Sequence, residues 1–152
     1  MTRKGISNTL AIFGLLLVLA VSFGDSLAYG HSLSIKVEGL RNEKGVVHLL
    51  LYDDAIAFEE NSLSHIAHYS AAPVSGAEVV VTVTGVTPGT YAAVLHHDEN
   101  ENNVFDMVDA IPIEGYAYSN AVGRVAVPTF DQAAFRFGGE DAAATIEMIY
   151  VD

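Results

Sequence analysis

An alternation of apolar and polar residues is the feature of this sequence that most restricts its fold. The stretch SLSIKVE, residues 32–38, alternates strictly, and residues 79–84, VVVTVT, repeat much of the pattern. Successive side chains of a β-strand point to opposite faces, so both stretches predict strands with one buried face. In the first stretch the buried residues would be Leu33, Ile35 and Val37.

Four further segments have strand character: residues 46–52, 91–96, 134–137 and 145–151. The first of them is almost continuously apolar, which is typical of an inner strand. Residues 53–69 fit neither the helical nor the strand period, so we expect a short helix near 54–68. Short strands without a long helical pattern predict an all-β fold, an antiparallel two-sheet sandwich of Ig-like or transthyretin-like type with about seven strands.

Thr87-Pro88-Gly89-Thr90 carries a turn signal between two of these strands. Proline presets φ at the second position of a type II turn, and glycine accepts the positive φ of the third. The sequence therefore predicts a tight type II turn over residues 87–90.

The N-terminus has the pattern of an export signal. Arg3 and Lys4 precede the apolar run 10–21, and small residues favour cleavage after Ala28, with a second possible site after Gly30. We expect a signal peptide over 1–28 and one domain over 29–152, exported to the periplasm or the extracellular space. The run is shorter than the ~20 residues of a membrane-spanning helix, so we expect no stable membrane insertion after cleavage.

The charge of the chain excludes several partners. Loss of Arg3, Lys4 and Asp25 with the signal leaves five basic and 18 acidic residues, a formal charge of −13. Such a surface repels phosphate backbones and anionic lipids, so nucleic acid is not an expected partner. The sequence has no cysteine, which excludes disulfides, thiolate metal sites and cysteine nucleophiles.

The loop at residues 98–109, DENENNVFDMVD, has the spacing of a twelve-residue calcium loop. Such loops place oxygen side chains at positions 1, 3, 5, 9 and 12 and a backbone carbonyl at position 7, because a hard cation takes six to eight oxygens. The candidate Ca²⁺ ligands are therefore Asp98, Asn100, Asn102, the Val104 carbonyl, Asp106 and Asp109. The alternative is an Asx-rich turn that satisfies its own backbone and binds nothing.

Two positions depart from the calcium-loop pattern. Asn103 stands where glycine makes the sharp turn, although asparagine tolerates the left-handed conformation. Asp109 replaces the usual glutamate, and Pro112 follows three residues later, so a long exit helix is not expected.

Two other groups of residues suggest alternative functions. His96 and His97 are expected on opposite faces of their strand, and His97 with Asp98 and a metal-bound water would make a hydrolase. Tyr116 and Tyr118, in an expected loop, would let a carbohydrate-binding module stack a sugar ring. The sequence contains no serine or cysteine nucleophile motif, so no catalytic residue is assigned.

The chain resembles a known family in several motifs. These are PGTYA at 88–92, HDEN at 97–100, IP at 111–112, EGY at 114–116, SN at 119–120 and PTF at 128–130. They are similar to the bacterial domain-of-unknown-function 2141 family, whose pattern usually has glycine at the positions of Glu101 and Asn103 and lysine at that of Ile113. The resemblance implies an exported β-sandwich of the bacterial envelope without an established activity.

Together these features predict an exported, non-enzymatic β-sandwich module. Calcium in the 98–109 loop would stabilise it by cancelling carboxylate repulsion, and its partner would be a protein or a glycan.

Overall fold

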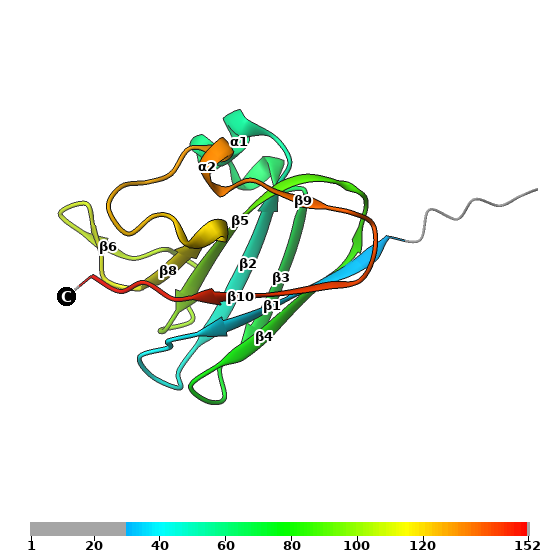
Figure 1. Cartoon of the computed structure of the whole chain (residues 1–152). Helices are drawn as coiled ribbons and strands as arrows, with labels where there is room; N and C mark the ends of the chain where they lie inside the picture. The colour runs from blue at the N-terminus through cyan, green and yellow to red at the C-terminus, as the bar shows by residue number, and fades with distance from the viewer. Residues whose placement is uncertain (1–29, 152) are drawn as a thin grey trace, which may run out of the picture.

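The computed structural model describes residues 30–151, which form two β-sheets packed face to face (Figure 1). The expected signal peptide, residues 1–28, lies outside the described residues. Within the described part, no helix has the length and apolar character needed to cross a membrane.

The smaller sheet has three strands in the order β10-β1-β4. Its strands are β1 (His31–Glu38), β4 (Val79–Val86) and β10 (Ala142–Glu147). The pairing of β1 with β4 is antiparallel, whereas the pairing of β1 with β10 is parallel. The chain reaches β10 by crossing from the other sheet over residues 138–141, so no hairpin imposes an antiparallel direction.

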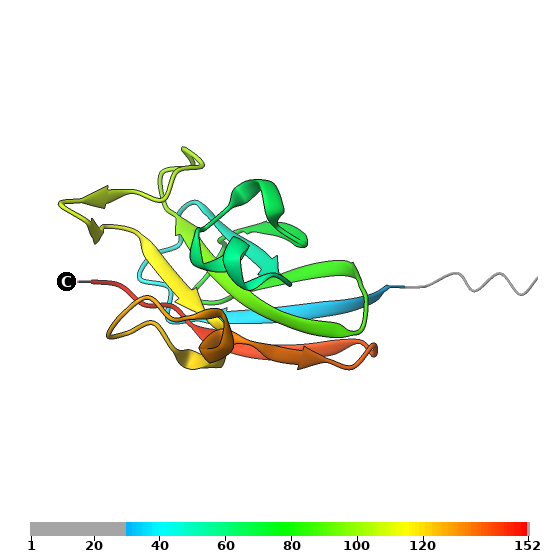
Figure 2. The ribbon, with the colours of Figure 1, turned by 90° about the horizontal axis from the view of Figure 1, so that it is seen from above.

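The larger sheet has five strands, with the order β3-β2-β5-β8 and with β9 paired to the start of β5. Its strands are β2 (Val46–Tyr52), β3 (His68–Pro73), β5 (Gly89–Asp98), β8 (Gly115–Tyr118) and β9 (Phe135–Phe137). A small hairpin of β6 (Met107–Val108) and β7 (Ile111–Pro112) projects from this sheet (Figure 2). The all-β sandwich is confirmed, with the parallel pair as its departure from the expected antiparallel arrangement.

The short helical elements lie in the connections. They are α1 (Ala55–Glu59), the 3₁₀ turns η1 (Leu63–His65) and η2 (Ser119–Ala121), and α2 (Phe130–Ala133). The expectation of a short helix near 54–68 is confirmed by α1, which begins where the Asp54 carboxylate accepts a hydrogen bond from the Ala57 N–H at 2.8 Å.

The predicted type II turn at 87–90 is wrong. Gly89 does not have a positive φ and already belongs to β5, whereas Gly85, near the end of β4, has a φ of 77°. The segment carries the chain between sheets, because β4 pairs with β1 and β5 pairs with β2. The Tyr91 hydroxyl donates a hydrogen bond to the Thr87 carbonyl at 3.0 Å and holds this crossing together.

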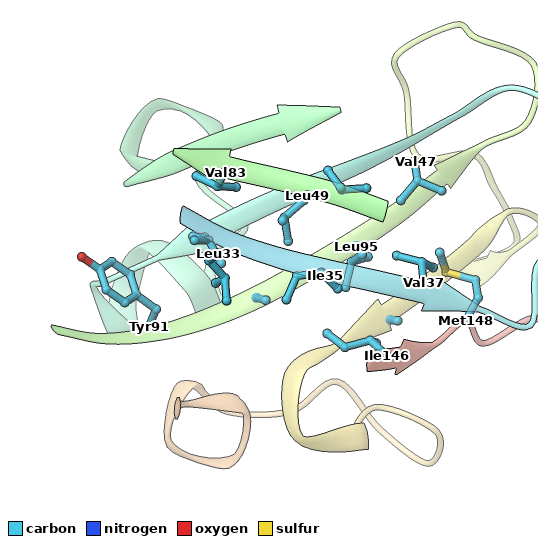
Figure 3. Close-up of a cluster of buried hydrophobic side chains, with 14 of the residues drawn as sticks. Leu33, Ile35, Val37, Val47, Leu49, Val83, Tyr91, Leu95, Ile146 and Met148 are labelled. Carbon is cyan, nitrogen blue, oxygen red and sulfur yellow. The ribbon is translucent and has the colours of Figure 1, made fainter. Parts of the chain in front are cut away.

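The main core lies between the two sheets. Leu33, Ile35 and Val37 of β1 face Leu49 and Leu95 of the larger sheet, as the period-two alternation predicts (Figure 3). All five side chains are buried. Burial of an aliphatic side chain of this size contributes about 1.5–3 kcal/mol, so this interface dominates the stability of the domain.

A second, smaller core lies on the outer face of the larger sheet. Helices α1 and α2 contact each other over one end of that face (Figure 1) and bury Tyr52, Phe58 and Ala92 beneath them. The helices cover that end only. The rest of the outer face, toward the ends of β2 and β5 nearest the 98–109 loop, carries the candidate site.

Candidate functional site

Polar side chains occupy the outer face of β2 and β5 because of the same alternation that builds the core. Leu49 and Leu95 point into the sandwich, so their neighbours His48 and His96 point outward. The two histidines are direct cross-strand partners, and their rings stack with centroids 5.5 Å apart.

A continuous row of rings extends from this histidine pair across the sheet. Tyr69 of β3 stacks on His48 at 5.9 Å, and Phe105 meets His96 edge to face at 5.0 Å. Phe105 in turn contacts Tyr116, which contacts Tyr118, each at 6.1 Å. We call this set the aromatic row: Tyr69, His48, His96, Phe105, Tyr116 and Tyr118.

Two buried carboxylates lie beside the histidines of the row. Asp98 is fully buried and Glu114 is 4% exposed. Glu114 Oε2 lies 2.7 Å from His96 Nε2, and Asp98 Oδ2 lies 3.5 Å from His48 Nε2. The His48 Nε2 atom is buried and has no hydrogen-bond partner among the described residues.

The carboxylate of Glu114 also holds the neighbouring loop. It accepts hydrogen bonds from the backbone N–H groups of Glu99 and Asp106, both at 3.1 Å. These bonds join the start and the end of the loop that carries Phe105. Glu114 therefore positions one ring of the aromatic row as well as the imidazole of His96.

The surroundings set the charge of His48 and Asp98. Burial and the adjacent His96 ring lower the pKa of His48, so His48 is neutral at pH 7. Burial alone would raise the pKa of Asp98, but the N–H groups of Asn103 and Asn102 outweigh it and lower that pKa. The floor of the site thus pairs a neutral imidazole with an ionised carboxylate.

A cavity of about 890 Å³ lies above the aromatic row. Its walls come from three connections, residues 61–66, 103–112 and 123–127, and its floor comes from β2, β5 and β8. We call it the cup. The side chains of its walls are mainly apolar and exposed to solvent: Val125 is 100% exposed, Leu63 73% and Val127 72%. Arg124, also in the wall, forms an ion pair with Glu147 at 2.6 Å.

The structure brings four of the six expected calcium ligands together. The side-chain amides of Asn100 and Asn102 both donate to Asp106 Oδ2, at 2.7 and 3.0 Å. The carboxylate of Asp98 accepts the N–H groups of Asn102 and Asn103, at 3.1 and 2.7 Å. The loop is therefore coiled around its own oxygens, and its internal hydrogen bonds account for its shape.

Asp109 lies apart from that cluster. Asp109 and Ala110 form the tip of the β6–β7 hairpin with φ values of 50° and 64°, as a two-residue type I′ turn requires. Val104 is 55% exposed, and its backbone N–H donates to Asn102 Oδ1 at 2.8 Å, so its backbone adjoins the cluster. Within residues 30–151, no group of three or more His, Cys, Asp or Glu residues is arranged to hold a metal ion.

The left-handed conformation expected at Asn103 is confirmed by its φ of 59°. Glu101 has a φ of 60°, so the two positions where the resembling family usually has glycine both adopt a conformation that glycine favours. The loop keeps this shape without the glycines because Asn103 and Asn102 are bonded to Asp98.

His97 does not meet Asp98, because adjacent strand residues face opposite sides of the sheet. The His97 ring is fully buried toward the smaller sheet's side. Its Nε2 donates to the Lys44 carbonyl, and its Nδ1 accepts from the Tyr150 hydroxyl, both at 2.7 Å. Both nitrogens are thus engaged in structural hydrogen bonds away from the cup.

Tyr116 and Tyr118 both lie in the floor of the cup, on β8 rather than in a loop. Sequence reasoning missed His48, Tyr69 and Glu114 as site residues. A signal existed for His48: it is a polar residue at an outward position of an otherwise apolar strand. Nothing local distinguishes Glu114, whose role depends on its distance from His96.

Comparison with known proteins identifies a bacterial family. The family model described as "Uncharacterized protein conserved in bacteria (DUF2141)" matches residues 35–145, which span both sheets and the whole cup floor. No curated protein and no solved structure matches the chain.

Proposed function

This chain belongs to the bacterial DUF2141 family, and we propose that it is an exported, non-enzymatic module that binds a small apolar molecule in the cup. The observation that carries the proposal is the cavity of about 890 Å³ above the aromatic row. The pattern of residues 1–28 supports export.

The size and lining of the cup support this function. Ligand pockets commonly have volumes of about 300–1,000 Å³ and are lined mainly by apolar and aromatic side chains with a few polar groups. A ligand that covers Leu63, Ile111 and Val127 would remove their surface from water, which contributes about 25 cal/mol per Å² of apolar area. Sugar recognition requires more polar groups, so an apolar molecule suits this lining better than the expected glycan.

The engagement of the polar groups supports binding rather than catalysis. Glu114 is occupied by His96 and by two backbone N–H groups, and Asp98 by two others. A general base must be free to reach a substrate proton, whereas these carboxylates hold the protein's own loop. The buried His97 has no free nitrogen for the proposed hydrolase.

Calcium binding by the 98–109 loop is a separate part of the proposal. The convergence of Asp98, Asn100, Asn102 and Asp106 supports it, as does the spacing of oxygens along the loop. An ion there would cancel repulsion between Asp98 and Asp106 and order the segment that carries Phe105. Calcium would then stabilise one wall of the cup.

Fluorescence of N-phenyl-1-naphthylamine, a neutral apolar probe, tests the binding function. We expect saturable enhancement with the wild-type domain and at least a tenfold weaker affinity for Val127→Asp, which places a charge in the cup wall. Val80→Asp is the matched control, because Val80 is 56% exposed on β4 of the other sheet. Absence of wild-type binding, or equal loss in both variants, would refute the proposal.

A further inference from the structure

We propose that the cup selects a small hydrophobic cation, an amine or quaternary ammonium group attached to an apolar body. This inference rests on the proposed function and specifies the ligand class for the same site. It follows from the charge beside the floor, the rings that line the cavity, and the charge of the walls.

Negative charge is buried beside the floor. Asp98 Oδ2 lies 3.5 Å from His48 Nε2, and Glu114 Oε2 lies 2.7 Å from His96 Nε2. A buried carboxylate attracts a nearby cation more strongly than a carboxylate in water does, because the effective dielectric constant is lower. The same two carboxylates would repel an anionic ligand in the cup.

Aromatic rings line the cavity. Phe105, Tyr116 and Tyr118 lie in a chain of edge-to-face contacts, and Tyr69 extends the row on the other side. Rings carry negative charge on their faces, so several rings around one cavity attract ammonium groups, most strongly those that are weakly hydrated.

The walls do not oppose a cation. Among the lining residues in the described part of the chain, the charged one is Arg124, and its charge is compensated by Glu147 at 2.6 Å. Asp106 and Asp109 belong to the same 103–112 connection without lining the cavity themselves, and the whole sequence has a formal charge of −12. The field over the cup therefore favours positive ligands.

An organic cation fits this floor better than a metal ion does. A metal ion needs several convergent oxygen or nitrogen ligands, and residues 30–151 contain no such group of His, Cys, Asp or Glu. An alkylammonium ion needs only apolar contact and a negative field, and the cup supplies both.

Three probes of equal chain length separate charge from apolar contact: octyltrimethylammonium, 1-octanol and octyl sulfate. Isothermal titration calorimetry at pH 7.5, below the micelle concentrations, gives the affinity of each. We expect the cation to bind at least tenfold more tightly than octanol does. Octyl sulfate should bind most weakly of the three. The advantage of the cation should shrink when NaCl is raised from 50 to 300 mM, since salt screens the field.

The variant Phe105→Leu tests the contribution of the rings, because leucine keeps an apolar side chain in the wall. We expect it to weaken octyltrimethylammonium several-fold and to leave octanol nearly unchanged. Equal binding of all three probes, or tighter binding of octyl sulfate, would overturn the inference while the proposed apolar site stood. Failure of all three to bind would overturn both.

Discussion

His48 and His96 face each other across strands β2 and β5 with ring centroids 5.5 Å apart, and a buried carboxylate lies beside each ring. This pair joins the two parts of the site. On one side it continues the aromatic row that forms the floor of the cup, and on the other it contacts the residues that hold the 98–109 loop.

The buried His48 predicts a pH-dependent stability. Its pKa is lowered in the folded state, where His96, Asp98 and Tyr69 face it, so the unfolded chain takes up the proton first as the pH falls below about 6.5. The stability that neutral His48 provides is therefore present above that pH and is lost as the pH falls toward its folded pKa. Thermal melting between pH 7.5 and 5.5 should show a falling midpoint.

The variant His48→Phe keeps a ring in the row and removes the titration, so its melting midpoint should depend less on pH over that range. His65→Phe changes an exposed histidine and is the control. Equal pH dependence in wild type and His48→Phe would contradict the assignment of this pH dependence to His48.

Asp98 affects stability in a separate pH range. Its lowered pKa means that its contribution to folding stability is lost only in more acidic solution, below about pH 4.

Glu114→Gln should destabilise the domain by about 1–3 kcal/mol. Glutamine offers one acceptor oxygen where the carboxylate offers two, so its amide nitrogen would face an N–H donor of Glu99, Asp106 or His96. Urea unfolding measures the loss. Glu140→Gln, on the exposed surface, should change the free energy of unfolding by less than about 0.5 kcal/mol, and a similar loss in both variants would disprove the role of Glu114.

Gly45 should not tolerate alanine. Its φ is 73°, and a Cβ atom there would lie 1.9 Å from the Asp98 carbonyl oxygen, so the base of the loop would have to move. We expect Gly45→Ala to cost more than about 2 kcal/mol in urea unfolding. Gly138→Ala is the control, because a Cβ atom there meets no atom within 4 Å, and its effect should be within about 1 kcal/mol. Equal free energies of unfolding for the two variants would show that the loop lies farther from Gly45 than this contact implies.

Calcium at millimolar concentration should raise the melting midpoint relative to chelator. The ion would neutralise the carboxylates of Asp98 and Asp106 and stabilise the folded state by mass action. Asp106→Asn should reduce this shift, and Asp131→Asn, on the exposed surface of α2, should retain it. A midpoint that does not respond to calcium would remove the ion from the proposal.

Part of the site could be predicted from the sequence. The oxygen spacing of 98–109 identified a segment whose members Asp98, Asn100, Asn102 and Asp106 do gather. The same spacing placed Asp109 with them, but Asp109 lies at the tip of a separate hairpin. Ligand spacing assumes one continuous coil, and the β6–β7 pairing interrupts it.

The sequence by itself determined which residues of each strand share a face, because side-chain alternation is a local property of extended backbone. Leu33, Ile35 and Val37 could be assigned to the core on that ground alone. Only the tertiary structure decided that His48, His96 and Glu114 meet, since long-range pairing makes β5 the neighbour of both β2 and β8, and Glu114 directly precedes β8. Alternation tells which way a side chain points, and the packing of whole sheets decides what it meets there.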